Sequence, residues 1–130
     1  MTANEMLPPG LLQSANDLAA QFLRDINGVN AVVVATVDGF ALASAFNRDN
    51  DAGRIAAMAS SISAIGSVVA MEAGLGTYRS VTINTESGFV VVHAVPRRDV
   101  ELVINAIADG DAILAQVVHR IGTMARQLML

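Results

Sequence analysis

The sequence predicts an α/β fold, a three-layer α/β/α sandwich in which a five-stranded, mainly antiparallel sheet carries helices on both faces. The first observation is the order of helical and strand-like segments, which reads α-β-β-α-β-β-β-α. The second is a set of turn signals, Asp38–Gly39, Glu86–Gly88 and Pro96–Asp99, which join consecutive strands as hairpins. The third is that three helices have to cover the two faces of such a sheet.

One domain accounts for the chain, because 130 residues fit a single hydrophobic core and no linker divides them. Residues 1–9 read as a flexible lead, since they end in two prolines, which cannot lie inside a helix. From residue 10 apolar side chains recur at helical spacing, and Asn27–Gly28 ends this first helix. We therefore expect a single domain at residues 10–130.

The strand segments begin directly after this helix. Residues Val29–Val37 are almost continuously apolar and β-branched, which indicates a strand covered on both faces. Asp38–Gly39 then predicts a type I′ turn, which needs two positive φ angles. The other strands are expected at Phe40–Phe46, Tyr78–Thr85, Phe89–Val95 and Val100–Ala108. The last of these can also be read as a short helix.

Residues Ala52–Gly74 predict one long helix, capped by Asn50 or Asp51, whose only ionisable side chains are Arg54 and Glu72. Its large residues form one row along the helix: Ile55, Met58, Ile62, Ile65 and Val69. Its small residues form a neighbouring row: Ala52, Ala56, Ala59, Ser63, Gly66 and Ala70. A surface helix of a small globular protein normally keeps a charged face, and this helix has none.

The missing charged face allows two interpretations. In the first, the helix is a central one that its own protein buries. In the second, it lies alone on one face of the sheet, and its outer side, with Met58, Val68 and Met71, forms an apolar patch larger than monomers usually expose. The row of small residues would let two helix backbones approach closely. We favour the second interpretation, homodimerisation through this helix.

The composition excludes several function classes. Only 15% of the residues are charged, against roughly 25% in a typical soluble domain. Either an alanine-rich composition with an ordinary core or surface covered in an oligomer explains this deficit, and we favour the covered surface. All 8 basic residues are arginines and the net charge is −4, so we expect no nucleic-acid partner. The absence of lysine excludes a standard P-loop and Schiff-base chemistry, and the absence of cysteine excludes thiol chemistry.

No residue pattern indicates catalysis. His93 lies in a predicted strand and His119 on the polar face of the last helix, and neither has a second ligand at metal spacing. We interpret His93 as a hydrogen-bonded structural residue and Gly74-Leu75-Gly76 as a helix end, not a dinucleotide motif. The sequence therefore predicts a protein that is not an enzyme and has no cofactor or metal.

Two features of the chain bear on its location. The N-terminus has neither a basic region nor an apolar signal core. The apolar stretches read as shorter than the roughly 20 residues that span a bilayer. We expect a cytoplasmic protein without membrane insertion.

The order of these segments resembles the Roadblock family, of dynein light-chain type, over about Leu11–Leu128. The residues that carry the resemblance are Gly28, VVVATVDGFALAS at Val32–Ser44, the small-residue helix, VTINTESGFVVVHAV at Val81–Val95, and LVINAIADGDAILAQV at Leu102–Val117. Hairpins with Asp-Gly are common, so the specificity comes from the order of all these segments. The resemblance implies the profilin-like fold of the family.

The resemblance also implies a non-enzymatic homodimer, with two sheets joined edge to edge and two central helices side by side. Tyr78–Thr85 would be the edge strand that pairs, so Tyr78, Val81 and Ile83 would join the helix residues in the interface. Bacterial family members are often associated with small Ras-like GTPases as regulators or scaffolds, and gliding-motility members act as GTPase-activating partners. Arg54 and Glu72, near the rims of the helix pair, are then candidate docking charges.

The arginines in or near loops, Arg48, Arg79, Arg97 and Arg98, read as solvated surface residues. A second function class stays open beside the GTPase platform. It is a small-ligand-sensing or signalling-scaffold domain with no GTPase partner. A ligand sensor would need a sizeable enclosed apolar pocket.

Overall fold

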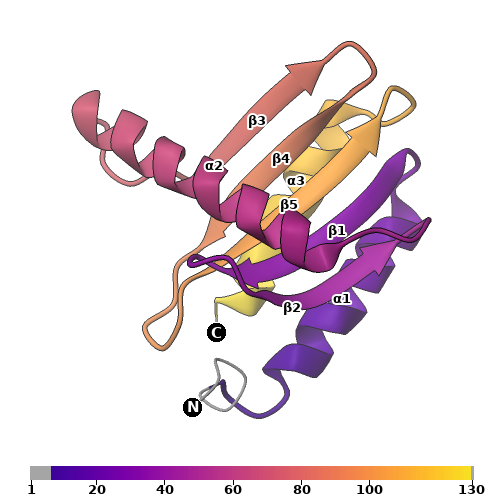
Figure 1. Cartoon of the computed structure of the whole chain (residues 1–130), viewed down its shortest axis with the longest axis horizontal. Coiled ribbons are helices and arrows are strands. Elements are labelled where there is room, and N and C mark those ends of the chain that lie inside the picture. The colour runs from indigo at the N-terminus through magenta and orange to yellow at the C-terminus, as the bar shows by residue number, and fades with distance from the viewer. Residues whose placement is uncertain (1–6, 130) are drawn as a thin grey trace.

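The structure, a computed structural model, describes residues 7–129 and has the element order that the sequence predicts (Figure 1). Residues 1–6 of the predicted lead lie outside the described part. The helices are α1 (Leu11–Asp25), α2 (Ala52–Glu72) and α3 (Leu114–Leu128). The strands are β1 (Val29–Thr36), β2 (Ala41–Phe46), β3 (Ser80–Thr85), β4 (Gly88–Val95) and β5 (Leu102–Asp109).

The five strands form one sheet in the order β2-β1-β5-β4-β3, and every neighbouring pair is antiparallel. Strands β1 and β5 are almost entirely buried, which fits their continuous apolar sequences. The segment that could also be read as a short helix is strand β5. Strands β2 and β3 form the two edges of the sheet.

The β1–β2 turn differs from the predicted type I′ turn. Gly39 has a positive φ of 100°, but Asp38 does not. The Gly39 amide donates to the Thr36 carbonyl oxygen at 3.0 Å, and the Thr36 amide donates to the Phe40 carbonyl oxygen at 2.9 Å. The loop therefore has three residues and closes with one left-handed glycine, an arrangement that needs only one positive φ.

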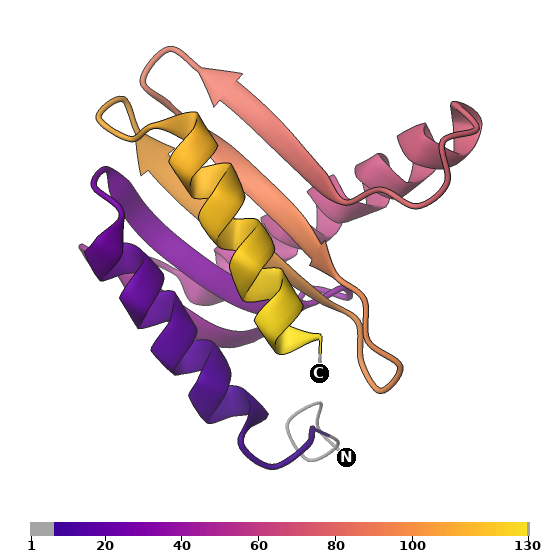
Figure 2. The same cartoon turned by 180° about the vertical axis from the view of Figure 1, so that it is seen from behind.

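The helices cover the sheet unequally. Helices α1 and α3 lie side by side on one face, and α2 crosses the other face alone (Figures 1 and 2). The core beneath α1 and α3 contains large buried side chains such as Phe22, Ile104, Met124 and Leu128. Burying each of these contributes about 1.5–3 kcal/mol. This face supplies most of the hydrophobic stabilisation. Because helices cover both faces of the sheet, the predicted three-layer sandwich is confirmed.

Helix α2 contacts the sheet mainly through its small residues. Its buried residues are Ile55, Ala56, Ala59, Ser63 and Gly66. The expectation that the small-residue row faces a second helix is therefore wrong, because the chain's own sheet already covers its central members. Since a buried methyl group contributes only about 0.8 kcal/mol, α2 is held by less apolar burial than α1 and α3.

The contact between α2 and β3 depends on close approach. A Cβ atom at Gly66 would lie 2.9 Å from Val81 Cγ2 and 3.1 Å from Tyr78 Cδ2. One helical turn earlier, the Ser63 and Tyr78 hydroxyls form a hydrogen bond. Burial raises the pKa of the Tyr78 hydroxyl, the Ser63 hydrogen bond lowers it, and the negative charge of Glu101 raises it; the net pKa lies above the ordinary 10.0. Tyr78, with its hydroxyl protonated, therefore connects α2 to the segment that leads into β3.

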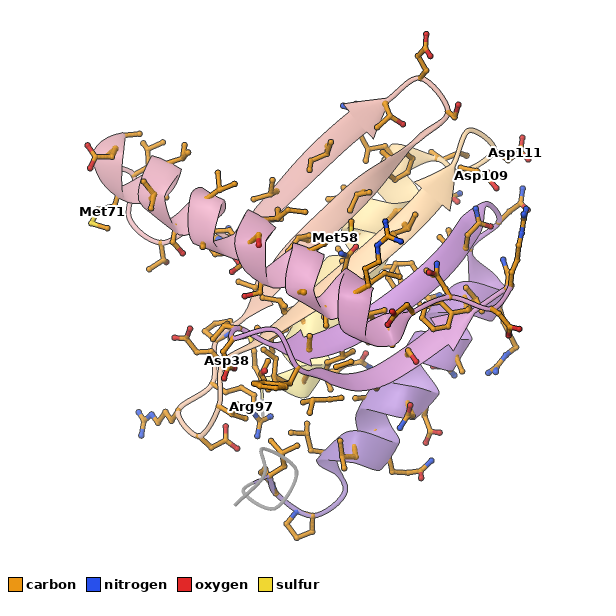
Figure 3. The ribbon with its side chains drawn as sticks, in the orientation of Figure 1. Asp38, Met58, Met71, Arg97, Asp109 and Asp111 are labelled. Carbon is orange, nitrogen blue, oxygen red and sulfur yellow. The ribbon has the colours of Figure 1, made fainter. Side chains whose placement is uncertain are left out.

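Arg97 is a structural residue and not the solvated arginine that the sequence predicts. Its side chain is only 6% exposed, and its guanidinium donates to both Asp99 carboxylate oxygens, at 2.8 and 2.7 Å, and to the Leu128 carbonyl oxygen (Figure 3). The guanidinium lowers the pKa of the Asp99 carboxyl to about 2. The β4–β5 turn thus holds the end of α3 in place.

The length of α2 corrects the expectation that the apolar stretches are shorter than a bilayer-spanning helix. It has 21 residues and contains an 18-residue stretch with a mean hydropathy of 1.5, so by length and composition it reaches the size of a bilayer-spanning helix. A core helix of a soluble protein passes the same test, and one face of α2 packs against the sheet. The expectation of no membrane insertion stays a prediction.

The amide of Asn105 generates a first prediction. Asn105 is 1% exposed, lies opposite Val33 and Val92 in the core beneath α2, and has no hydrogen-bond partner for either amide atom among the described residues. Because an unpaired buried polar group costs about 1–3 kcal/mol, Asn105→Val is expected to raise the free energy of unfolding by about 1–2 kcal/mol. Urea denaturation measures the change.

The control for this prediction is Asn47→Val. The Asn47 Nδ2 donates to the Val29 carbonyl oxygen at 2.9 Å and to Asn30 Oδ1 at 3.3 Å, so this variant is expected to lose stability. A clear loss of stability in Asn105→Val as well would show that the buried amide has a partner.

Two glycines of α2 allow a matched comparison. Gly66→Ala forces α2 and β3 apart, whereas in Gly53→Ala the new Cβ meets only Asp51 Oδ1, at 3.4 Å. Alanine favours a helix over glycine by up to about 1 kcal/mol, so Gly53→Ala is expected to stabilise. At Gly66, overpacking of about 1–3 kcal/mol is expected to cancel or reverse that gain. Equal stability of the two variants in urea would contradict the close-approach explanation.

Candidate functional site

Both ends of α2 are defined by local hydrogen bonds. At the start, Asp51 Oδ1 accepts from the Arg54 amide at 3.1 Å, which confirms one of the two predicted caps. At the end, the Leu75 amide donates to the Ala70 carbonyl oxygen and the Gly74 amide to that of Met71, both at 3.0 Å. This pair of bonds is a Schellman motif, so the helix end predicted at Gly74-Leu75-Gly76 is confirmed.

The large residues of α2 mostly face solvent. We call this exposed apolar surface the free face; it consists of Met58, Ile65, Val68, Val69 and Met71. Ile65 is 63% exposed and Met71 69%, and Figure 3 shows Met58 and Met71 at different positions along the helix. A row of large apolar side chains in water is unfavourable for a monomer and typical of an interaction site.

One flank of α2 is already occupied. The Ser60 hydroxyl donates to the Val37 carbonyl oxygen at 2.5 Å, and the Cβ position of Gly39 lies 3.6 Å from Ala57 Cα. The β1–β2 turn therefore packs along this side of the helix. The opposite flank, which carries Ile62 and Ile65, has no such cover from the described residues.

The sheet beside that opposite flank is partly uncovered. Residues Val81 and Ile83 of β3 lie on the α2 face, because Val81 contacts α2 and side chains alternate along a strand. Ile83 is 41% exposed, and its neighbours across the sheet, Val90 and Ile107, are half-buried on the same face. We call Ile83, Val90 and Ile107 the open corner of the sheet.

Strand β3 adds an unpaired edge to these apolar surfaces. It pairs with β4 on one side only, and its residues are mostly exposed. It is shorter than the predicted Tyr78–Thr85, because Tyr78 and Arg79 precede the strand. Free backbone groups along an exposed edge favour pairing with another strand.

The predicted interface residues divide into three groups. Those covered by the chain's own sheet are Ile55, Ala56, Ala59, Ser63 and Gly66. Those that are partly buried are Ala52, Ile62, Ala70, Tyr78 and Val81. Those that are exposed are Met58, Ile65, Val69 and Ile83, together with the charged Arg54 and Glu72.

The prediction omitted Leu75, which is 79% exposed directly beyond α2. A signal for it was present in the sequence. A hydrophobic residue right after a helix-terminating glycine occupies the position that often makes an apolar contact in a Schellman motif.

Groups suited to catalysis are few among the described residues. His93 Nδ1 lies 2.8 Å from the Ala94 carbonyl oxygen, in the structural role that the sequence predicts. Asp109, at the end of β5, accepts from Asn30 Nδ2 at 3.1 Å and from the Asp111 amide at 2.9 Å, so its carboxylate closes a turn. No group of three or more potential metal ligands occurs within residues 7–129.

Two surface depressions of this part of the chain are open to solvent. One is lined by Ala64, Ile65, Val68 and Val69 on the free face. The other is lined by Pro96, Arg97, Arg98, Asp99 and Met129. Neither encloses a small molecule, so neither favours a ligand sensor. The arrangement is suited to binding a protein surface.

Comparisons with known proteins agree with this fold. Residues 15–105 match the model of the Roadblock/LC7 domain family, a span that runs from α1 into β5. No curated protein matches the sequence significantly.

Three solved structures show how far the similarity extends. The gliding protein MglB from Thermus thermophilus is 15% identical, with a TM-score of 0.82 over 95% of this chain and 91% of that chain. A Roadblock/LC7 domain from Streptomyces avermitilis is 16% identical, with a TM-score of 0.78 over 87% and 92%. Profilin IB from Acanthamoeba castellanii is 12% identical, with a TM-score of 0.59 over 91% and 96%. The family match, together with this profilin-like fold, leads to one conclusion: the chain belongs to the Roadblock/LC7 domain family.

Proposed function

We propose that this chain is a cytoplasmic, non-enzymatic homodimer that binds a small Ras-like GTPase and regulates it or holds it in place. The observation that carries this proposal is the free face of α2, an apolar surface of Met58, Ile65, Val68, Val69 and Met71 next to an unpaired sheet edge. The family supports the GTPase as partner, since bacterial Roadblock proteins are often associated with such enzymes.

The dimer is supported by the features that a single copy leaves incomplete. The flank of α2 that carries Ile62 and Ile65 lies beside the open corner, so the helix flank and the sheet form two adjoining apolar surfaces. A two-fold axis at the β3 edge would place a second α2 against both surfaces and pair the two β3 strands. Since the central members of the small-residue row are already buried, the large residues make this contact.

The positions of the two charged residues of α2 support the GTPase contact. Arg54 and Glu72 are exposed at opposite ends of a helix that has no other ionisable residue. At a rise of 1.5 Å per residue they lie about 27 Å apart, so they border the apolar platform without interrupting it. Rim charges of this kind set the orientation of a partner and its association rate. The chain therefore offers an apolar centre with a charge of each sign at its ends.

The oligomeric state tests the first half of the proposal. Sedimentation equilibrium at micromolar concentration is expected to show a dimer for the natural sequence. Ile65→Asp is expected to weaken dimerisation at least about tenfold, because a carboxylate would be buried without a partner.

The matched control is Val118→Asp, an apolar-to-acidic change at an exposed position of α3 on the other side of the sheet, and it is expected to stay dimeric. A monomeric natural protein would overturn the proposal. Equal weakening by the two variants would remove α2 from the interface.

Binding to a candidate GTPase tests the second half. Arg54→Glu and Glu72→Arg are each expected to weaken binding by about three- to tenfold, because each reverses one rim charge. Arg24→Glu, at an exposed position of α1, is expected to leave affinity unchanged. Calorimetric titration with the GDP-bound and GTP-bound forms measures the affinity.

A hydrolysis assay with the same proteins separates an activator from a scaffold. Unchanged affinity in both reversal variants would sink the proposed docking role of these charges. The dimeric state of each variant is measured in parallel, so that loss of the dimer is not mistaken for loss of docking.

A further inference from the structure

Gly122 lies in the middle of α3 at a position where packing does not require a glycine. A Cβ atom there would lie 3.7 Å from Arg126 Nη1 and 3.9 Å from His93 Nε2, which are ordinary van der Waals distances. Alanine would therefore fit, and alanine favours a helix more than glycine does. Apart from the adjoining residues and the helix's own backbone, no other described atom lies within 4 Å of this point. We call the space between Gly122, His93 and Arg126 the Gly122 gap.

The guanidinium of Arg126 is positioned at this gap by hydrogen bonds along α3. The Thr123 hydroxyl donates to the His119 carbonyl oxygen at 3.1 Å and accepts from Arg126 Nη2 at 3.2 Å. The other terminal nitrogen, Nη1, lies beside the gap. No ion pair within residues 7–129 includes Arg126, so no carboxylate of this part neutralises its charge.

The imidazole of His93 borders the gap from the sheet. His93 is half-buried on the α3 face of β4, and its Nδ1 lies 2.8 Å from the Ala94 carbonyl oxygen. A carbonyl oxygen can only accept, so Nδ1 carries the hydrogen, and Nε2 of the neutral ring has a free lone pair. Nε2 lies beside the gap, and no described residue donates a hydrogen bond to it.

These two nitrogens require different groups from a ligand. Arg126 Nη1 donates, so it favours a negatively charged oxygen. His93 Nε2 of the neutral ring accepts, so it requires an O–H. Hydrogen phosphate supplies both from one tetrahedral group, because it keeps one O–H beside its charged oxygens. Sulfate and an ionised carboxylate offer acceptors only.

The Gly122 gap can be reached from solvent. Helix α3 packs on β4 and β5, and Figure 2 shows β3 uncovered beside it. Arg126 is exposed and Gly122 is half-buried. Ser80 of β3 lies directly opposite His93 in the β3–β4 pair, so an exposed hydroxyl lies on the same face as the imidazole. An anion in the gap therefore has a third polar side chain beside it.

We propose that the Gly122 gap binds inorganic phosphate as hydrogen phosphate. Arg126 Nη1 donates to a charged oxygen of the ligand, and His93 Nε2 accepts from its O–H. Gly122 is the residue that leaves room for the ligand's oxygen atoms. The gap lies on the face of the sheet opposite α2, so this inference goes beyond the proposed GTPase platform and does not depend on it.

An NMR titration of the natural protein with sodium phosphate tests the site at about pH 8, where an imidazole is ordinarily neutral. The ring signals of His93 are expected to shift, and those of His119, the other histidine of the chain, are the internal control. Sodium sulfate and methyl phosphate, at matched ionic strength, are expected to bind at least about tenfold more weakly. Neither has an O–H for Nε2 at this pH, and a tenfold difference is the size expected for one lost hydrogen bond.

Two variants place the binding in the gap. Gly122→Ala is expected to abolish the phosphate-induced shift and keep the fold, because the new methyl group fills the gap at van der Waals distances. Arg126→Gln is expected to weaken phosphate binding about tenfold or more, because it removes the positive charge. The matched control is Arg24→Gln, which also removes an exposed arginine from the last turn of a helix and is expected to bind phosphate unchanged.

Four results would overturn the inference. The first is that phosphate leaves the His93 signals of the natural protein unchanged. The second is equal binding of sulfate and phosphate, because the Nε2 lone pair would then not select the ligand. The third is an unchanged shift in Gly122→Ala, and the fourth is equal weakening by Arg24→Gln and Arg126→Gln, which would indicate a nonspecific charge effect. None of these measurements depends on dimerisation or GTPase binding, so each leaves the proposed function intact.

Discussion

The close approach of α2 to the sheet determines which side chains of this helix remain in contact with solvent. Gly66 has room for no side chain between the helix, Val81 and Tyr78. The alanines of the same row let the helix axis lie close to β1 and β5. Because the small residues of α2 pack against its own sheet, most of its large residues face solvent. The apolar free face is therefore a consequence of how α2 is packed.

The two faces of the sheet consequently have different tasks. Beneath α1 and α3, large side chains such as Phe22 and Leu128 are completely enclosed, and this layer can hold the domain together. Beneath α2, the core is smaller and includes the unpaired amide of Asn105. The stable layer lets the other layer be specialised for contact, because the free energy of folding does not have to come from α2. Strand β3, which receives little cover from either layer, adds backbone groups to the contact surface.

Much of the fold could be predicted from patterns along the chain. The continuous apolar run at Val29–Thr36 and the turn signals around Gly88 correspond to buried strands and short hairpins in the structure. The predicted type I′ turn was wrong because Asp-Gly also suits a three-residue loop, and the φ of Asp38 and the hydrogen bonds of Thr36 distinguish the two. Arg97 was misjudged because its partners, Asp99 and the Leu128 carbonyl, meet it only after α3 packs against the sheet.

The candidate site was predicted in part. Helical spacing predicted a large row and a small row, but Ile55 of the large row is buried together with the small row. Spacing alone does not tell which residues face the protein's own sheet. Leu75 was overlooked because it follows the helix, where periodicity no longer applies. Its exposure depends on the projection of α2 past β3, which is a property of the assembled layers (Figure 2).

Residue types and local spacing were enough to predict the segments, their order, the lack of a nucleotide-binding lysine and the family. Which side of α2 is free, where the sheet is open, and how far the helix extends beyond its edge became visible only in the assembled fold. Local preferences form a helix or a strand, whereas the rotation of a helix on a sheet is set by the packing of both surfaces at once. In this chain a glycine and a row of alanines set that rotation.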